Sequence, residues 1–248
     1  MLIEVNKKRK YPRMKSLAII PARSGSKGLK DKNIKSFVGK PLLAFTILAA
    51  KESQCFDEIM VSTDSKEYAA IAMEYGASVP FLRSNRMSSD DASSWDVVDE
   101  VLEGYSSIDR RFDCFCLLQP TSPLRNAEHI KNAFDEMRLK QAKAIVGVTE
   151  AGHSLALYNT LPADSSMSNF VNQGDKLRRR QDYKEIYYRI NGAIYLIDVP
   201  FFQESRNIYR DGCYAFEMDR LSSIDIDDKV DFALAELIYK EIDNGSFF

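Results

Sequence analysis

Short, continuous apolar runs alternate with amphipathic stretches along most of this chain. The runs predict buried strands, because a strand covered on both faces carries few polar positions. They span residues 16–20, 58–64, 79–82, 114–120, 144–150 and 192–199. The stretches between them place apolar residues on one side at helical spacing and predict helices. These span residues 41–53, 65–76, 95–105 and 127–138, and a last helix lies within 222–243.

This alternation predicts the α/β class, as a single three-layer Rossmann-like domain with a mostly parallel sheet. The rhythm breaks between residues 152 and 188, a polar segment that we interpret as an excursion from the core. Residues 1–14 include a run of basic side chains and are predicted to be a disordered tail. The domain is therefore expected to span residues 15–248.

Composition narrows the possible partners. The 248 residues carry a formal net charge of −2, which gives no basic field for nucleic acid or for an anionic membrane. No apolar run approaches the roughly 20 residues that span a bilayer. The four cysteines form no C-x-x-C pair, which favours a reducing compartment. We expect a cytoplasmic protein with a small-molecule partner.

The loop after the first predicted strand reads PARSGSKGLKDKN and spans residues 21–33. Gly25 and Gly28 would let the backbone approach an anion, and Arg23, Lys27 and Lys32 supply charge for a polyphosphate. The loop matches neither G-x-x-x-x-G-K-[ST] nor G-x-G-x-x-G. A surface turn kept in solution by its lysines is the alternative reading.

A second cluster follows near the C-terminus. In an extended segment, Asp225 and Asp227 point to the same side while the isoleucines beside them turn to the core. Two carboxylates at that spacing can share a hydrated Mg²⁺ that also takes phosphate ligands. The alternative is that Asp227 or Asp228 caps the last helix.

Other polar clusters also come directly after predicted strands. They include residues 62–64, Arg83 and residues 119–125. Ligands of open α/β sheets bind beyond the carboxyl ends of the strands, so these clusters are expected to converge.

Several stretches together resemble one family. IPARSGSKGLKDKN is similar to the N-terminal signature of the acylneuraminate (CMP-sialic acid synthetase) cytidylyltransferases. VSTD, LLQPTSPLR, RRQDY, RINGAIYLID and SIDIDD follow in the order of that family. The resemblance covers about residues 15–241.

The resemblance implies a nucleotidyltransferase that joins CTP to a nonulosonic acid, with release of pyrophosphate and with Mg²⁺ as cofactor. Lys27, Asp225 and Asp227 match catalytic positions, and the two aspartates match the metal pair. The positions that match nucleotide-binding residues are Arg23, Ser26, Lys27, Lys32, Asn33, Arg83 and Ser94. Those that match sugar-binding residues are Gln119, Arg180, Gln181, Arg189 and Asn191.

The family's equivalent of the excursion reaches a second subunit, which implies a homodimer in which Arg180 and Gln181 serve the neighbouring site. A solvated arginine run is the alternative. Two positions depart from sialic-acid-specific relatives, because Ala156 replaces a lysine and Lys184 replaces a proline. Legionaminic or pseudaminic acid therefore competes with N-acetylneuraminate as substrate. The rival functions are a 3-deoxy-manno-octulosonate cytidylyltransferase and a non-catalytic nucleotide-binding module.

Overall fold

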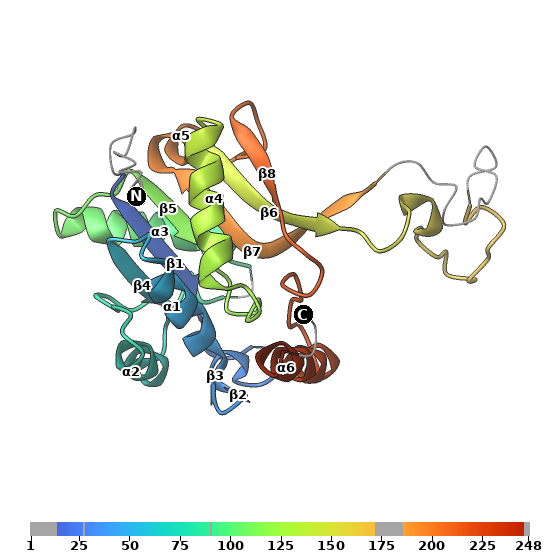
Figure 1. Ribbon diagram of the computed structural model, residues 1–248, viewed down its shortest axis with the longest axis horizontal. Helices are drawn as coiled ribbons and strands as arrows, with labels where there is room; N and C mark the ends of the chain where they lie inside the picture. The colour runs from blue at the N-terminus through green and yellow to red at the C-terminus, as the bar shows by residue number, and fades with distance from the viewer. Residues whose placement is uncertain (1–13, 27, 90, 172–185, 246–248) are drawn as a thin grey trace, which may run out of the picture.

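The computed structural model describes residues 14–26, 28–89, 91–171 and 186–245, and its centre is a six-stranded sheet (Figure 1). The strands lie in the order β4-β1-β5-β7-β6-β8. They are β1 (Ser16–Pro21), β4 (Glu58–Ser62), β5 (Cys114–Leu117), β6 (Ala144–Glu150), β7 (Tyr188–Asp198) and β8 (Cys213–Glu217). Of these described strands, only β7 runs antiparallel to its neighbours. The mostly parallel sheet of the sequence prediction is confirmed.

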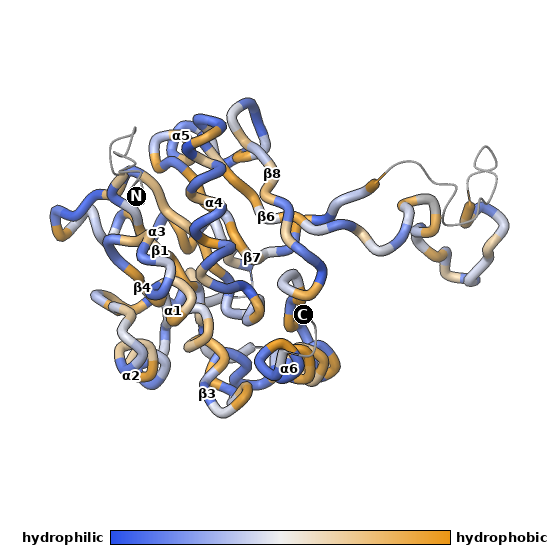
Figure 2. Tube along the Cα trace, in the orientation of Figure 1, coloured by the Kyte–Doolittle hydropathy of each residue, from blue (hydrophilic) through white to orange (hydrophobic). Residues whose placement is uncertain are grey.

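Helices cover both faces of the sheet. One face packs on α1 (Leu42–Ser53), α2 (Lys66–Glu74) and α4 (Ala127–Leu139). The other packs on α3 (Ser94–Ser107) and α5 (Val199–Glu204). Apolar positions concentrate along the strands and the inner helix faces, as the hydropathy colouring of Figure 2 shows. This is the three-layer arrangement that the alternating pattern predicted.

The predicted strand at residues 79–82 is wrong. Residues 79–82 form neither a strand nor a bridge, and only the preceding Ser78 makes an isolated bridge, to Met60 in β4 at the edge of the sheet. Pro80 has no backbone N–H to extend this pairing. Conversely, the pattern did not predict β8 or α5, which are short and carry weak periodicity.

A smaller core lies beside the sheet, where the hairpin of β2 (Ser36–Phe37) and β3 (Lys40–Pro41) meets α6 (Lys229–Asp243). Phe37 is fully buried there, with edge-to-face contacts to Phe45 and Phe232. Ile226 is buried in the same cluster. This packing anchors the segment just before α6, which carries the two predicted metal ligands.

The chain between β6 and β7 projects from the body of the molecule (Figure 1). Its described part contains only a single 3₁₀ turn, η2 (Leu155–Leu157), which agrees with the predicted loss of strand and helix alternation over residues 151–171. We call residues 151–171 the arm. No described helix is both long and apolar enough to cross a bilayer. The predicted tail lies almost entirely outside the described residues.

Candidate functional site

The reversed direction of β7 brings several segments to one edge of the sheet. Because β7 is antiparallel to β5, its start lies at the same end of the sheet as the carboxyl ends of β1, β4 and β5. A cavity of about 660 Å³ opens at this edge. Most of the predicted site residues line it, namely Arg23, Ser26, Lys32, Asn33, Arg83, Ser94, Gln119, Asp225 and Asp227. Their convergence agrees with the expectation from the strand ends.

The loop after β1 is held in place by hydrogen bonds to neighbouring segments. The backbone N–H and hydroxyl of Ser24 both donate to the carboxylate of Asp64, each at 2.7 Å. Burial would raise the pKa of Asp64, but the bonds from Ser24 outweigh it and hold the pKa below its usual value. The amide of Asn33, which is buried, donates to the carbonyl of Arg23 at 3.1 Å. The buried side chain of Asn33 thus fixes the backbone of the loop at Arg23.

Gly28 has a structural reason that the sequence did not reveal. A Cβ at this position would lie 2.5 Å from the carbonyl oxygen of Asp227. The loop after β1 therefore packs directly on the backbone of the acidic segment. Lys32 strengthens this contact, since its ammonium donates to the carbonyl of Ile226 at 2.5 Å and lies 3.7 Å from the carboxylate of Asp227.

Arg83 forms a buried cationic wall of the cavity. Its guanidinium donates to the hydroxyl and the carbonyl of Ser62, at 3.0 and 2.7 Å. Burial lowers the pKa of Arg83 to about 10, and nearby Asp64 opposes that shift. The side chain therefore stays charged at neutral pH. Residues 84–89 and 91–92 belong to a loop from which Met87, Ser89 and Ala92 line the cavity, and Arg23 donates to the carbonyl of Ser88 in that loop at 3.1 Å.

The capping alternative for the acidic segment is resolved by the geometry of α6. Asp228 is the cap, and its carboxylate accepts from the backbone of Val230 and Asp231 at 2.7 and 3.0 Å. Asp231 completes the capping box by accepting from the N–H groups of Asp227 and Asp228. The carboxylates of Asp225 and Asp227 take no part in the cap and line the cavity instead.

Asp225 has a buried carboxylate oxygen that a ligand could satisfy. Its Oδ1 is buried without a hydrogen-bond partner among the described residues. Burial raises the pKa of this carboxyl, the negative charge of Asp227 adds to the shift, and the hydroxyl of Thr121 with Lys32 and Arg189 opposes it. A cation between the two aspartates would satisfy this oxygen. No cluster of three or more ligating side chains occurs in the described part of the chain, and Mg²⁺ commonly takes only one or two carboxylates beside phosphate oxygens.

The sugar-side predictions divide. Arg189 stands at the exposed start of β7, donates to the carbonyl of Ser223 at 3.0 Å, and is near enough to Asp225 to affect its pKa, although it does not line the cavity. Asn191 is buried and bonded to the hydroxyl of Ser223 and to the backbone N–H of Ala193. That geometry favours a structural role for Asn191. Lys27, Arg180, Gln181 and Lys184 lie outside the described residues.

Sequence reasoning missed several cavity residues. They are Met87, Ser89, Ala92 and Val97, whereas Pro21, Pro120 and Thr121 lie in stretches that the sequence analysis expected at the site but were given no role. Met87, Ala92 and Val97 add apolar side chains to the wall of the cavity that Arg83 also lines. Met87 and Ala92 lie in a polar loop without periodicity, and Val97 reads as an ordinary core residue of α3.

Comparisons with known proteins agree with the family resemblance seen in the sequence. The family model described as "Cytidylyltransferase" matches residues 17–242. The chain is 38% identical over 230 residues to "N-acylneuraminate cytidylyltransferase" of Escherichia coli O18:K1:H7, which covers 92% of this chain and 53% of the relative. It is 39% identical over 230 residues to "CMP-N,N'-diacetyllegionaminic acid synthase" of Legionella pneumophila, which covers 90% of this chain and 95% of the relative. The chain thus spans about half the length of the first relative and nearly all of the second.

A solved structure shares the fold. The structure of CMP:2-keto-3-deoxy-manno-octonic acid synthetase complexed with CTP matches with a TM-score of 0.69 at 17% identity, over 92% of this chain and 99% of that one.

Proposed function

Because the chain belongs to the cytidylyltransferase family, we propose that it transfers the cytidylyl group of CTP to the anomeric hydroxyl of a nonulosonic acid. The hydroxyl oxygen bonds to the α-phosphorus, the bond to the β-phosphate breaks, pyrophosphate leaves and the hydroxyl proton passes to solvent. The observation that carries this proposal is the convergence of the basic loop, Arg83, Gln119 and the acidic pair on one cavity.

In this proposal the chain mainly positions charge. In-line phosphoryl transfer asks a protein to align the reactants and to neutralise the leaving group. Arg23, Ser26, Lys32 and Asn33 stand on the loop that would face the triphosphate, and Lys27 is assigned to the same loop from the sequence. The apolar side chains of Met87, Ala92 and Val97 suit a flat pyrimidine ring, and Ser94, the first residue of α3, lines the same cavity. No described residue that lines the cavity is a histidine.

We assign Asp225 and Asp227 as the residues that would hold Mg²⁺. The unpartnered Oδ1 of Asp225 and the exposed carboxylate of Asp227 fit a hard cation, and a bound Mg²⁺ would offset negative charge on the phosphates. Lys32 contacts the same segment and would hold the basic loop at a fixed distance from the acidic pair.

The acid proposed as substrate is a deoxygenated, bis-acylamino nonulosonate. Ala156 removes a cation that the resemblance places on the sugar side in sialic-acid-specific relatives, so a substrate that depends on this cation loses a contact. Relatives named for N,N'-diacetyllegionaminic acid and for N-acylneuraminate are similar to this chain at 39% and 38% identity, so the choice rests on Ala156. Arg189 would anchor the carboxylate, so N-acetylneuraminate is expected to remain a weak substrate.

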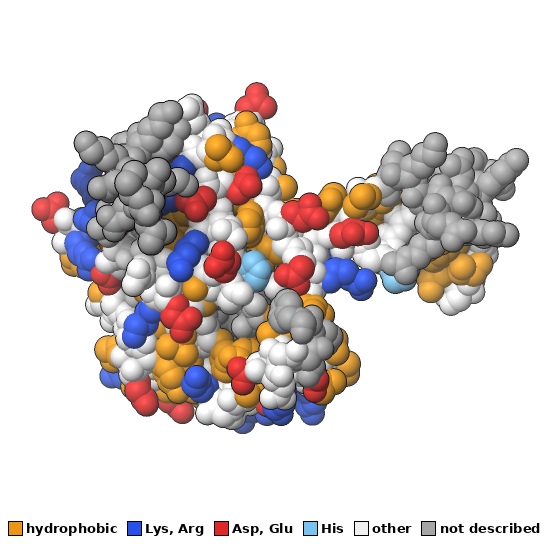
Figure 3. All heavy atoms as spheres, in the orientation of Figure 1, with side chains coloured by type: hydrophobic (Ala, Val, Ile, Leu, Met, Phe, Trp, Pro, Cys, Tyr) orange, Lys and Arg blue, Asp and Glu red, His pale blue; other side chains and the backbone are white. Residues whose placement is uncertain are grey.

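The proposed assembly is a homodimer formed through the arm. Large apolar side chains are exposed there, and they gather at the far end of the arm (Figure 3). They are Leu155, Leu157, Tyr158, Leu161 and Met167, exposed by 40 to 60%. A second copy of the chain would cover them, with Arg180 and Gln181 facing its site. A single domain over residues 15–248 and a cytoplasmic location complete the proposal.

Pyrophosphate release tests the function. Purified protein is incubated with CTP and Mg²⁺ together with N,N'-diacetyllegionaminic acid, pseudaminic acid, N-acetylneuraminic acid or 3-deoxy-manno-octulosonic acid. The highest specificity constant is expected with a bis-acylamino acid. Preference for the eight-carbon acid would favour the rival enzyme, and no release with any acid would favour a non-catalytic module.

A further inference from the structure

A buried arginine lies behind the cavity. Arg125 is 1% exposed and, among the described residues, pairs with no carboxylate. Burial lowers its pKa to about 10, so it still carries its charge at neutral pH. Burying a cation without a counterion is costly, and the residue is therefore expected to do more than fill space.

The guanidinium joins three separate elements. Its Nη1 donates both to the carbonyl of Gln119, at 3.2 Å, and to the carbonyl of Ala193, at 3.0 Å. Its Nη2 donates to the hydroxyl of Thr46 on α1 at 2.6 Å. Arg125 thus ties the loop after β5 to β7 and ties both to the helix layer.

The bond to Ala193 falls at a bulge. The pairing of β6 with β7 passes from Val146↔Tyr195 to Val148↔Ile190, so β7 holds extra residues between these pairs. Within the bulge, Gly192 has a φ of +75°. The N–H of Ala193 donates to the side chain of Asn191, and its carbonyl accepts from Arg125. Side chains therefore satisfy both backbone groups that have left the ladder.

The same point is where β5 and β7 separate. Their antiparallel pairing ends at Leu117↔Tyr195, and two residues further the same register would set Gln119 opposite Ala193. Nη1 of Arg125 instead bridges these two carbonyls. The opening lies beside the cavity, since the Oε1 of Gln119 is 2.6 Å from a Cβ built on Gly192, and Oδ2 of Asp225 is 3.8 Å from it.

We propose that Arg125 is a positioning residue that holds open the end of the β5 and β7 pair and thereby sets Gln119, the Gly192 bulge and Asp225 at their spacing for the sugar acid. The inference rests on the proposed function. Arg125 does not line the cavity, and it acts through the two carbonyls that it bridges.

A purely structural role predicts a different result, and the chain offers a matched control. Thr46 is fully buried and contacts the same guanidinium through Nη2, away from Gln119 and Ala193. Thr46→Val leaves a guanidinium N–H without its acceptor and should lower stability, but it keeps the bridge at Nη1. Arg125→Lys keeps the charge and loses the double bridge, whereas Arg125→Met loses both.

The experiment measures melting temperature, KM for the sugar acid and KM for CTP in the wild-type chain and the three variants. Both Arg125 variants are expected to raise KM for the acid by on the order of 10- to 100-fold, because loss of the bridge would displace Gln119 and the bulge by up to about 1 Å. KM for CTP should change little. Thr46→Val should lower the melting temperature and leave both constants near the wild-type values. Gln119→Ala should cost much less in the Arg125→Lys background than alone, because Gln119 is already displaced there.

Equal changes in both KM values, or an Arg125→Lys enzyme with wild-type constants, would overturn the proposal. So would failure of both Arg125 variants to fold, since the residue would then serve the fold. If the wild type turned over none of the acids, the proposed function would be overturned, and with it the proposed role of Arg125.

Discussion

Gly28→Ala tests whether the basic loop and the acidic pair form one unit. The new Cβ would lie 2.5 Å from the carbonyl oxygen of Asp227, and real Cβ atoms essentially never approach closer than 3.0 Å. The contact is with backbone, so no side chain can rotate away. The loop or the acidic segment must therefore move by at least about 0.5 Å, as the difference between these distances requires.

The kinetic cost follows from this displacement. A misplacement of about 1 Å in a reacting site costs on the order of 100-fold in rate, so Gly28→Ala should lower kcat/KM by about 10- to 100-fold, or roughly 1.4 to 2.7 kcal/mol. Because either movement changes the spacing between the loop and Asp227, the Mg²⁺ concentration for half-maximal activity should rise as well. Pyrophosphate release measured over a Mg²⁺ titration supplies both numbers.

Gly39→Ala is the control. Gly39 has a φ of +79°, so alanine is strained there, but no atom lies within 4 Å of the added Cβ. This variant should lose stability and keep its kinetics. A Gly28→Ala enzyme with wild-type kcat/KM and Mg²⁺ dependence would refute the coupling of loop and acidic pair.

Three further outcomes are expected. Lys27→Ala should lower kcat/KM by about 10- to 150-fold through loss of a charge-assisted phosphate contact, and unchanged kinetics in a folded variant would return the loop to a surface turn. Val38 precedes Gly39 in a hairpin turn that favours Asn-Gly, and its φ of 44° is strained for a β-branched residue. Val38→Asn should therefore raise the free energy of unfolding by about 1 kcal/mol and the melting temperature by about 2 to 4 °C. An unchanged melting temperature would contradict backbone strain at Val38. Burial would raise the pKa of Glu58, but hydrogen bonds from Ser78, Arg110 and Tyr105 lower this pKa overall. The ionised Glu58 therefore stabilises the fold above the unfolded pKa of about 4.3, and this contribution is lost as pH falls through the folded pKa. Urea unfolding of wild type and Glu58→Gln should differ at pH 7 and converge at low pH, and a constant difference would contradict this.

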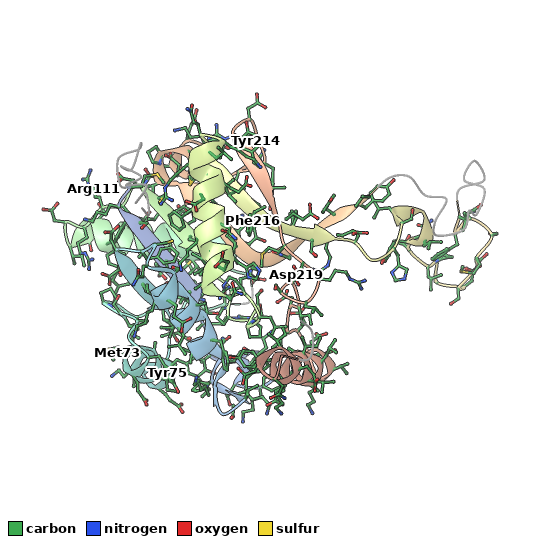
Figure 4. All side chains as sticks on the ribbon, in the orientation of Figure 1. Met73, Tyr75, Arg111, Tyr214, Phe216 and Asp219 are labelled. Carbon is green, nitrogen blue, oxygen red and sulfur yellow. The ribbon has the colours of Figure 1, made fainter. Side chains whose placement is uncertain are left out.

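The sequence predicts the core of this fold because its elements have clear periods. The strand at residues 16–20 and the helix at residues 127–138 were predicted from the pattern of apolar and polar positions alone. Segments whose structure depends on distant partners were not. The edge strand β8 gains its order from pairing with β6, and Phe216 in it packs on the face that α4 covers (Figure 4).

The candidate site shows the same limit. Residues directly after strands, such as Arg83 and Gln119, were placed correctly at the cavity because strand ends converge in any such sheet. The roles of Gly28 and Arg125 depend on contacts 199 and 68 residues apart along the chain, to Asp227 and Ala193. No local pattern encodes those contacts. Asp219, in the loop after β8 (Figure 4), likewise organises Ser222 and Ser223 near the acidic pair through bonds that the sequence did not suggest.

The central claim is that this cavity carries out cytidylyl transfer with the help of Asp225 and Asp227. Phosphorus NMR of the purified protein with CTP, Mg²⁺ and N,N'-diacetyllegionaminic acid tests it most directly. The wild type should convert the triphosphate signals into one phosphodiester signal and pyrophosphate, and the folded Asp225→Asn, Asp227→Asn double variant or excess EDTA should leave CTP unchanged. Unaltered CTP with the wild type across the panel of acids, or full conversion by the double variant, would contradict the account.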